Sequence, residues 1–240
     1  MTVPPAGFAP TPPSAPARPA WVADLERVVA GARAEDLSRF LPPPGHRRRS
    51  AVLMLFGPEA DGGGPDVLLT ERSATMRSHP GQVSFPGGAF DPGDDGAVAC
   101  ALREAAEETG LGPAGVEVLG TLPAVYLPVS DHAVTPVVGW WREPTPVAAV
   151  DPAEVARAVR VPVRELLDPA ARVLVTHPSG WVGPGFEASG LFVWGFTAGL
   201  LDRLFALAGW ERPWDRGRLV PAPLPPQPPP AAGPGPGDPS

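Results

Sequence analysis

Hydrophobic residues recur every three or four positions in several stretches of the chain, which is the period of an amphipathic helix. In the first stretch Trp21, Leu25, Val28 and Val29 share one side. Asp94 or Asp95 is placed to cap a later helix and Gly110 to end it, because these residue types favour helix ends. The pattern predicts helices over Trp21–Ala30, 96–109, Pro152–Val159, Val163–Leu167 and Phe192–Ala208.

Shorter apolar runs bounded by glycine and proline are typical of strands. They lie at Ala51–Phe56, Val67–Thr70, Val83–Phe85, Val116–Leu122, Val134–Trp141 and Arg172–Thr176. Strands and helices follow no regular alternation, which predicts an α/β fold with a mixed sheet flanked by helices. We expect one domain over residues 20–218. The proline-rich ends, 1–19 and 219–240, have the composition of disordered tails.

The composition excludes several kinds of chemistry. The formal net charge is −7, and all 19 basic residues are arginine. Without lysine the chain has no P-loop, no Schiff base and no pyridoxal-phosphate site. The acidic balance disfavours binding to duplex nucleic acid. Cys100 is the single cysteine, so it forms no internal disulfide and no cysteine-rich zinc site, and we expect it to be buried.

The sequence carries no sign of a membrane segment. The N-terminal stretch lacks the continuous apolar region of a secretory signal. The longest apolar run, Gly190–Leu201, is too short to span a bilayer. We expect a cytoplasmic protein that binds neither membranes nor nucleic acid, with a homodimer left open.

Three carboxylates share one face of the helix predicted over 96–109. Glu104, Glu107 and Glu108 stand at i, i+3 and i+4. On a solvated face they would repel only weakly. In a cleft, each pair would repel by about 3 kcal/mol at ~5 Å and an effective dielectric of ~20. A divalent cation would offset that repulsion, and carboxylate oxygens suit Mg²⁺ or Mn²⁺.

The neighbourhood of these glutamates favours the cation interpretation. Pro86-Gly87-Gly88 forces a turn just before the helix, where side chains would obstruct a phosphate or a metal. Arg103 is adjacent to the first glutamate and is placed to hold a carboxylate through paired hydrogen bonds. Together these features indicate a site for a metal and a diphosphate.

The stretch from Phe85 to Leu111 resembles the Nudix box, G-x5-E-x7-R-E-U-x-E-E-x-G-U, where U is aliphatic. Residues 103–111, REAAEETGL, fit its second half. The upstream glutamate of the pattern is absent. Counted back from Arg103, the position of that glutamate is Asp95. Counted forward from Gly88, it is Asp94. The segment between Gly88 and Arg103 is therefore one residue longer than in the pattern.

A second pattern resembles the signature of the coenzyme A pyrophosphatase branch of the Nudix hydrolases. Residues 68–88 follow L-L-T-x-R-S-x3-R-x3-G-x3-F-P-G-G without a mismatch. Val134–Gly139 and Trp194–Ala198 are similar to further segments of that branch, and the likeness covers about residues 50–208. From the residues alone, Arg72 and Arg77 are placed either to meet phosphates or to form structural ion pairs.

The resemblance implies an α/β/α sandwich that hydrolyses coenzyme A or its thioesters to adenosine 3′,5′-bisphosphate and 4′-phosphopantetheine or its acyl form. Glu104, Glu107 and Glu108 would hold Mg²⁺ or Mn²⁺ together with the Gly88 carbonyl, and Arg103 would orient them. Arg72, Arg77, Gly87 and Gly88 would bind substrate.

Glu154 is the candidate general base, although it equally suits the start of a helix. The alternatives are a Nudix hydrolase of NADH, ADP-ribose or an ADP-sugar, a nucleotide triphosphatase, or a catalytically silent ligand sensor.

Overall fold

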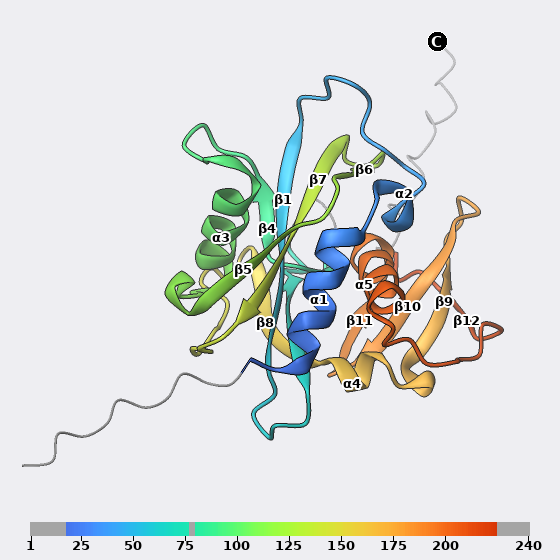
Figure 1. Ribbon diagram of the computed structural model, residues 1–240. Coiled ribbons are helices and arrows are strands. Elements are labelled where there is room, and N and C mark those ends of the chain that lie inside the picture. Colours follow the sequence, from blue (N-terminus) through green and yellow to red (C-terminus); the bar gives the residue numbers. More distant parts are fainter. Residues whose placement is uncertain (1–17, 77–79, 225–240) are drawn as a thin grey trace, which may run out of the picture.

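The structure is a computed structural model that describes residues 18–76 and 80–224 (Figure 1). Its helices are α1 Ala20–Gly31, α2 Ala34–Leu37, α3 Gly96–Thr109, α4 Val163–Leu166 and α5 Gly195–Ala208, with 3-10 turns at Pro113–Gly115 and Pro169–Ala171. Its strands are β1 Arg49–Pro58, β2 Pro65–Arg72, β3 Val83–Ser84, β4 Gly87–Ala89, β5 Val116–Thr121, β6 Val125–Leu127, β7 His132–Trp141, β8 Val155–Pro162, β9 Arg172–Thr176, β10 Val182–Ala188, β11 Leu191–Val193 and β12 Leu219–Pro221.

The larger sheet is mixed, as the sequence predicts. Its central order is β3-β2-β1-β7-β5, with β4 beside β1, β6 beside β7 and β8 beside β2. Strands β1 and β7 run parallel, whereas β2, β4 and β8 are antiparallel to their neighbours. Four further strands form a second sheet in the order β11-β10-β9-β12, which the sequence pattern did not predict.

The two faces of the larger sheet carry two hydrophobic cores. Along β1 the side chains alternate, so that Leu53 and Leu55 pack with α3, while Met54 and Phe56 pack with α1, α5 and part of the second sheet. Figure 1 shows α3 on one side of the sheet and α1 and α5 on the other. This is the predicted α/β/α arrangement.

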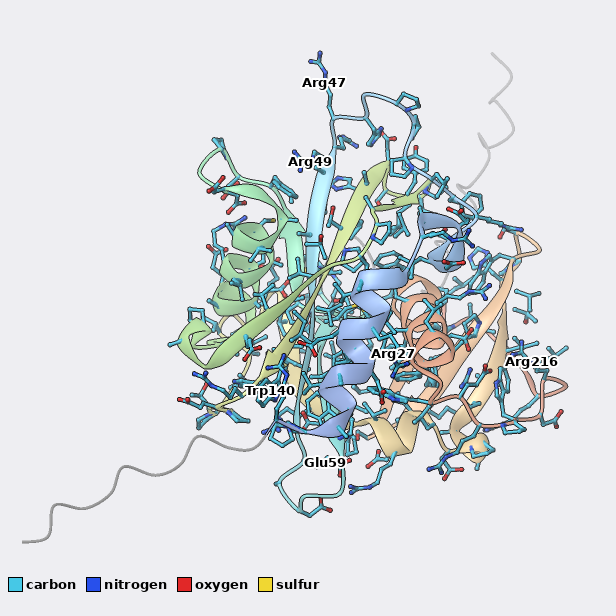
Figure 2. The ribbon with its side chains drawn as sticks, viewed as in Figure 1. Arg27, Arg47, Arg49, Glu59, Trp140 and Arg216 are labelled. Carbon is cyan, nitrogen blue, oxygen red and sulfur yellow. The ribbon has the colours of Figure 1, made fainter. Side chains whose placement is uncertain are left out.

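Several predicted core residues are buried. Cys100 and Trp141 have no exposed surface, and Trp140 is almost fully buried. Figure 2 labels Trp140 close to the start of α1, where the Arg18 guanidinium lies over its ring. The tryptophan pair at the end of β7 therefore belongs to the core.

The helix predicted over Pro152–Val159 is wrong. Residues from Val155 onward form strand β8, which pairs with the full length of β2. Val155 and Val159 have helical spacing, but the neighbouring edge of β2 offers backbone partners, and β-branched residues suit a strand. The helix predicted from Phe192 likewise begins only at Gly195, because Leu191–Val193 pair with β10.

The folded part extends further toward the C-terminus than predicted. Residues Leu219–Pro221 were assigned to the tail, but they form β12 and pair in parallel with β9. Residues 1–17 and 225–240 of the predicted tails lie outside the described residues. Within the described ranges, none of the helices has the length and apolar character needed to cross a bilayer.

Candidate active site

Two glycines bring the backbone of β4 against β1 and α3. Gly87 pairs with Val52 at a φ of +154°, and a Cβ there would lie 2.3 Å from the Ala51 carbonyl oxygen. A Cβ on Gly88 would lie 2.4 Å from Oε2 of Glu104. The two glycines therefore form a strand paired with β1 and not the predicted turn, and they allow a close approach between backbone and carboxylate that side chains would prevent.

Helix α3 places its three glutamates at different depths. The side chain of Glu107 is 61% exposed and that of Glu104 is 19% exposed, whereas Glu108 is buried. The opposite face, with Cys100, Ala101 and Ala105, packs on the sheet. The helix ends at Gly110, whose left-handed φ of +69° confirms the predicted stop.

Arg103 connects the acidic groups around the start of α3. Its Nη1 donates to Glu104 at 2.9 Å and to Glu107 at 3.1 Å. Its Nε and Nη2 donate to the carboxylate of Asp94 at 3.0 and 2.9 Å, and Nη2 also donates to the Ala89 carbonyl. Hydrogen bonds from Arg103 lower the pKa of Asp94 to about 2. Arg103 thus holds the carboxylates of Asp94, Glu104 and Glu107 around one guanidinium group; we call the side of α3 with Glu104, Glu107 and Glu108 the acidic face.

Asp94 and Asp95 make different contacts. Asp95 occupies the N-cap position of α3 but makes no capping hydrogen bond, and its ψ of 67° departs from the extended backbone of most N-caps. Asp94 instead binds Arg103 and accepts a hydrogen bond from the backbone N–H of Asp91. Sequence spacing alone left this residue undecided.

Glu108 is the most perturbed carboxyl group of the site. Its pKa is raised to about 7, mainly by burial and in part by the charges of Glu104 and Glu154, while the backbone N–H of Gly87 and the charge of Arg72 act in the opposite direction. The Gly87 hydrogen bond measures 3.1 Å. Burial also raises the pKa of Glu104. The site therefore concentrates negative charge that favours a bound proton or cation.

Glu154 joins this cluster from the turn before β8. Its backbone N–H donates to the Asp151 carbonyl at 3.0 Å, and its own carbonyl accepts the N–H of Ser73 at 2.9 Å. Its charge acts on both Glu104 and Glu108. The structure thus brings Glu154 to the acidic face in a turn, not at the start of a helix.

Of the two arginines predicted to bind substrate, the structure describes Arg72 but not Arg77. Arg72 ends β2 close enough to influence Glu108, and its Nε is buried without a hydrogen-bond partner among the described residues. Arg77 lies outside the described residues. Sequence reasoning missed the two backbone bonds that dock the next segment on α3, from Ala148 N to Thr109 O and from Val150 N to Glu108 O.

The donor set fits a divalent cation by its chemistry. It consists of carboxylate oxygens beside the glycine cradle, and hard cations prefer such ligands. Within residues 18–76 and 80–224, no three Asp, Glu, His or Cys side chains are already arranged around one metal position. Glu104 and Glu107 are instead turned toward Arg103. The fit therefore rests on charge, ligand type and the glycine cradle.

The sequence matches the family described as the NUDIX domain over residues 46–180. This chain belongs to the Nudix family. It is 41% identical over 177 residues to the "Uncharacterized Nudix hydrolase NudL" of Cronobacter sakazakii, covering 70% of this chain and 86% of that protein. The protein of the same name from Escherichia coli strain K12 is 40% identical over 149 residues, covering 58% and 73%.

A solved Nudix structure shows the same fold. The crystal structure of RenU, a Nudix hydrolase from M. Smegmatis, superposes with a TM-score of 0.50 at 22% identity, covering 71% of this chain and 91% of that one. Nudix hydrolases act on diphosphate bonds of nucleotide-derived small molecules and generally use divalent metal ions. The acidic face of α3 lies within the matched Nudix segment.

Proposed function

We propose that this Nudix protein hydrolyses the diphosphate bond of coenzyme A or its acyl thioesters. Water adds to one phosphorus atom and the bond from that phosphorus to the bridging oxygen breaks. This gives adenosine 3′,5′-bisphosphate and 4′-phosphopantetheine or its acyl form. The observation that carries the proposal is that Arg72, from the signature at 68–88, lies close enough for its charge to act on buried Glu108 of the Nudix box.

Glu104, Glu107 and Glu108 would hold Mg²⁺ or Mn²⁺, with the Gly88 carbonyl as a further oxygen ligand. When bound, the ion neutralises charge on the diphosphate and makes water a better nucleophile. Arg103 holds Glu104 and Glu107 in place through its Nη1. Gly87 and Gly88 leave the backbone open to the diphosphate.

Glu154 is the proposed general base, accepting the proton of the attacking water at its carboxylate. Its support is its charge interaction with both Glu104 and Glu108 from a separate segment of the chain. The hydrogen bond between Ser73 N and the Glu154 carbonyl fixes the backbone that carries it. Arg72 and Arg77 would bind the phosphates of the substrate, because guanidinium groups pair with phosphate oxygens through two hydrogen bonds.

The test is product analysis after incubation with coenzyme A, NADH and ADP-ribose, each with Mg²⁺, Mn²⁺ or EDTA. We expect metal-dependent release of adenosine 3′,5′-bisphosphate from coenzyme A. Turnover of only NADH or ADP-ribose would keep the hydrolase and reject the coenzyme A assignment. Tight nucleotide binding without turnover of any of the three would instead support a ligand sensor.

A further inference from the structure

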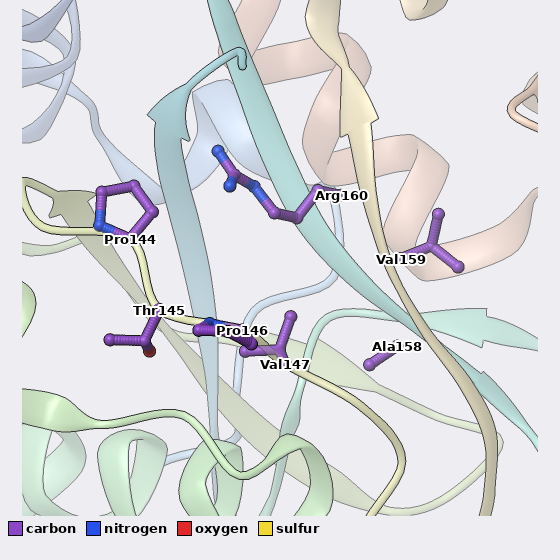
Figure 3. Close-up of a pocket in the computed structure, with 7 residues that line it drawn as sticks. All are labelled: Pro144, Thr145, Pro146, Val147, Ala158, Val159 and Arg160. Carbon is purple, nitrogen blue, oxygen red and sulfur yellow. The ribbon is translucent and has the colours of Figure 1, made fainter.

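A shallow pocket of about 540 Å³ lies between the segment Pro144–Val147 and residues Ala158–Arg160 of β8. Figure 3 shows Arg160 reaching across from β8 toward Pro144, with Pro146 and Val147 facing the side of Ala158. The lining is mainly proline, valine and alanine. Its one charged group, Arg160, pairs with buried Asp66 at 2.7 Å, so the pocket carries little net charge.

The strand register places this pocket on the face of the sheet that carries the acidic site. Thr70 pairs with Ala158 and Leu68 pairs with Arg160, and Leu68 belongs to the core beneath α3. Arg72 stands further along β2. At about 3.3 Å per residue, the pocket begins about 7 Å and ends about 13 Å from Arg72 along the strand.

The opposite wall is also connected to the acidic site. Residues Pro144–Val147 continue directly into the segment whose Ala148 and Val150 N–H groups bond to the last turn of α3. That segment then leads to Glu154. Both walls of the pocket therefore belong to elements that position the proposed catalytic groups.

We propose that this pocket binds the uncharged arm of the substrate beyond the diphosphate. This inference rests on the proposed function. An amide-and-alkyl arm such as pantetheine spans about four extended residues, roughly 14 Å, which matches the distance from Arg72 to the end of the pocket. The lining suits its alkyl groups.

The arrangement also orients the substrate. A pocket with little net charge gives no favourable partner to the phosphates of adenosine 3′,5′-bisphosphate, because phosphates require cationic or N–H donors. The nucleotide half therefore lies on the other side of the diphosphate, away from Ala158. The two reaction products should consequently depend on different residues for binding.

The experiment measures product inhibition in variants that fill the pocket. Ala158→Phe places an aromatic ring inside it, and Pro146→Trp adds bulk at its exposed rim. We expect about a tenfold rise in KM for coenzyme A and in Ki for 4′-phosphopantetheine, a loss typical of excluding part of a ligand. The Ki for adenosine 3′,5′-bisphosphate should stay within about twofold.

Val129→Trp is the matched control, because Val129 is 88% exposed on the turn between β6 and β7 and does not line the pocket. Circular dichroism checks folding, and Pro146→Trp decides the test if Ala158→Phe unfolds. Unchanged constants for 4′-phosphopantetheine in an enzyme that cleaves coenzyme A would overturn the pocket alone. No cleavage of coenzyme A by the unmodified protein would overturn the proposed function and this inference together.

Discussion

The guanidinium of Arg103 and the carboxylate of Asp94 form two hydrogen bonds, of 3.0 and 2.9 Å, across the start of α3. The same guanidinium holds Glu104 and Glu107. Asp94 therefore controls the position of the acidic face indirectly, through the arginine. On this geometry we propose a positioning role for Asp94.

Asp94→Asn should lower kcat/KM by about tenfold or more, because removing the outer partner of a metal-ligand network has that typical effect. Asp95→Asn should stay within about twofold of the unmodified enzyme, since Asp95 makes no capping hydrogen bond. Steady-state kinetics on the diphosphate that the protein cleaves measures both. A larger loss in the Asp95 variant would contradict the assignment.

Glu107→Gln and Glu108→Gln should each remove most turnover, by about 100-fold or more, while leaving the fold intact. The amide keeps the shape of the side chain but loses the charge that attracts a cation. Glu143→Gln, at a 65% exposed side chain outside the site, serves as the control. Near-normal activity in both site variants would contradict the assignment of these glutamates as metal ligands.

Replacing either glycine of β4 by alanine should have a different effect, a loss of stability at Gly87 and a loss of activity at Gly88. In Gly87→Ala the new methyl meets the backbone of Ala51 and Val52 at a left-handed φ, so the free energy of unfolding should fall by at least about 2 kcal/mol. In Gly88→Ala the methyl meets only the end of the Glu104 side chain. That carboxylate would move, and activity should fall roughly tenfold to 100-fold with little loss of stability. Urea unfolding and kinetics on both variants separate these effects.

Stability should depend on pH through Glu108. Its folded pKa of about 7 lies above the ordinary 4.5, so the folded state binds more protons between these values. Its contribution is full below pH 4.5 and is lost as the pH rises through 7. The free energy of unfolding in EDTA should fall by up to about 3 kcal/mol over this range. Urea unfolding from pH 5 to 8 should show a shallower fall for Glu108→Gln, and equal slopes would refute the assignment.

Arg72→Ala should weaken coenzyme A and its 3′-dephospho analogue by similar factors, because the charge of Arg72 acts on Glu108 and the proposed site therefore places Arg72 at the diphosphate. A hydrogen-bonded charge pair of this kind is worth about tenfold in kcat/KM. The comparison uses the two substrates in parallel on the unmodified and variant enzymes. A loss confined to coenzyme A would instead place Arg72 on the 3′-phosphate and would remove the match between the arm length and the pocket.

The sequence predicts the helix α3 well because its period, its glycine stop and its three carboxylates are local features. It fails at β8, where Val155 and Val159 fit a helix by spacing, and only the neighbouring edge of β2 makes them a strand. The same limit applies to the site. The spacing could not choose between Asp94 and Asp95, because the choice depends on where Arg103 reaches in space.

It is harder still to predict from the sequence which distant residues join the site. Glu154 was selected as an acid outside the box, but its approach to Glu104 and Glu108 follows from the turn at Asp151 and the bond to Ser73 N. The docking of Ala148 and Val150 on α3 leaves no signal in the residue types, because it uses backbone groups alone.

That docking divides the segment between β7 and β8 into two parts with different tolerance for change in length. The backbone N–H groups of Ala148 and Val150 are hydrogen-bonded to α3. A residue inserted before them should therefore lengthen the loop near Pro144 and leave Glu154 in place. A residue inserted after Val150 would displace Glu154 directly. With the substrate arm in the pocket, as proposed, remodelling one short loop would change substrate preference while keeping the spacing of the proposed catalytic groups.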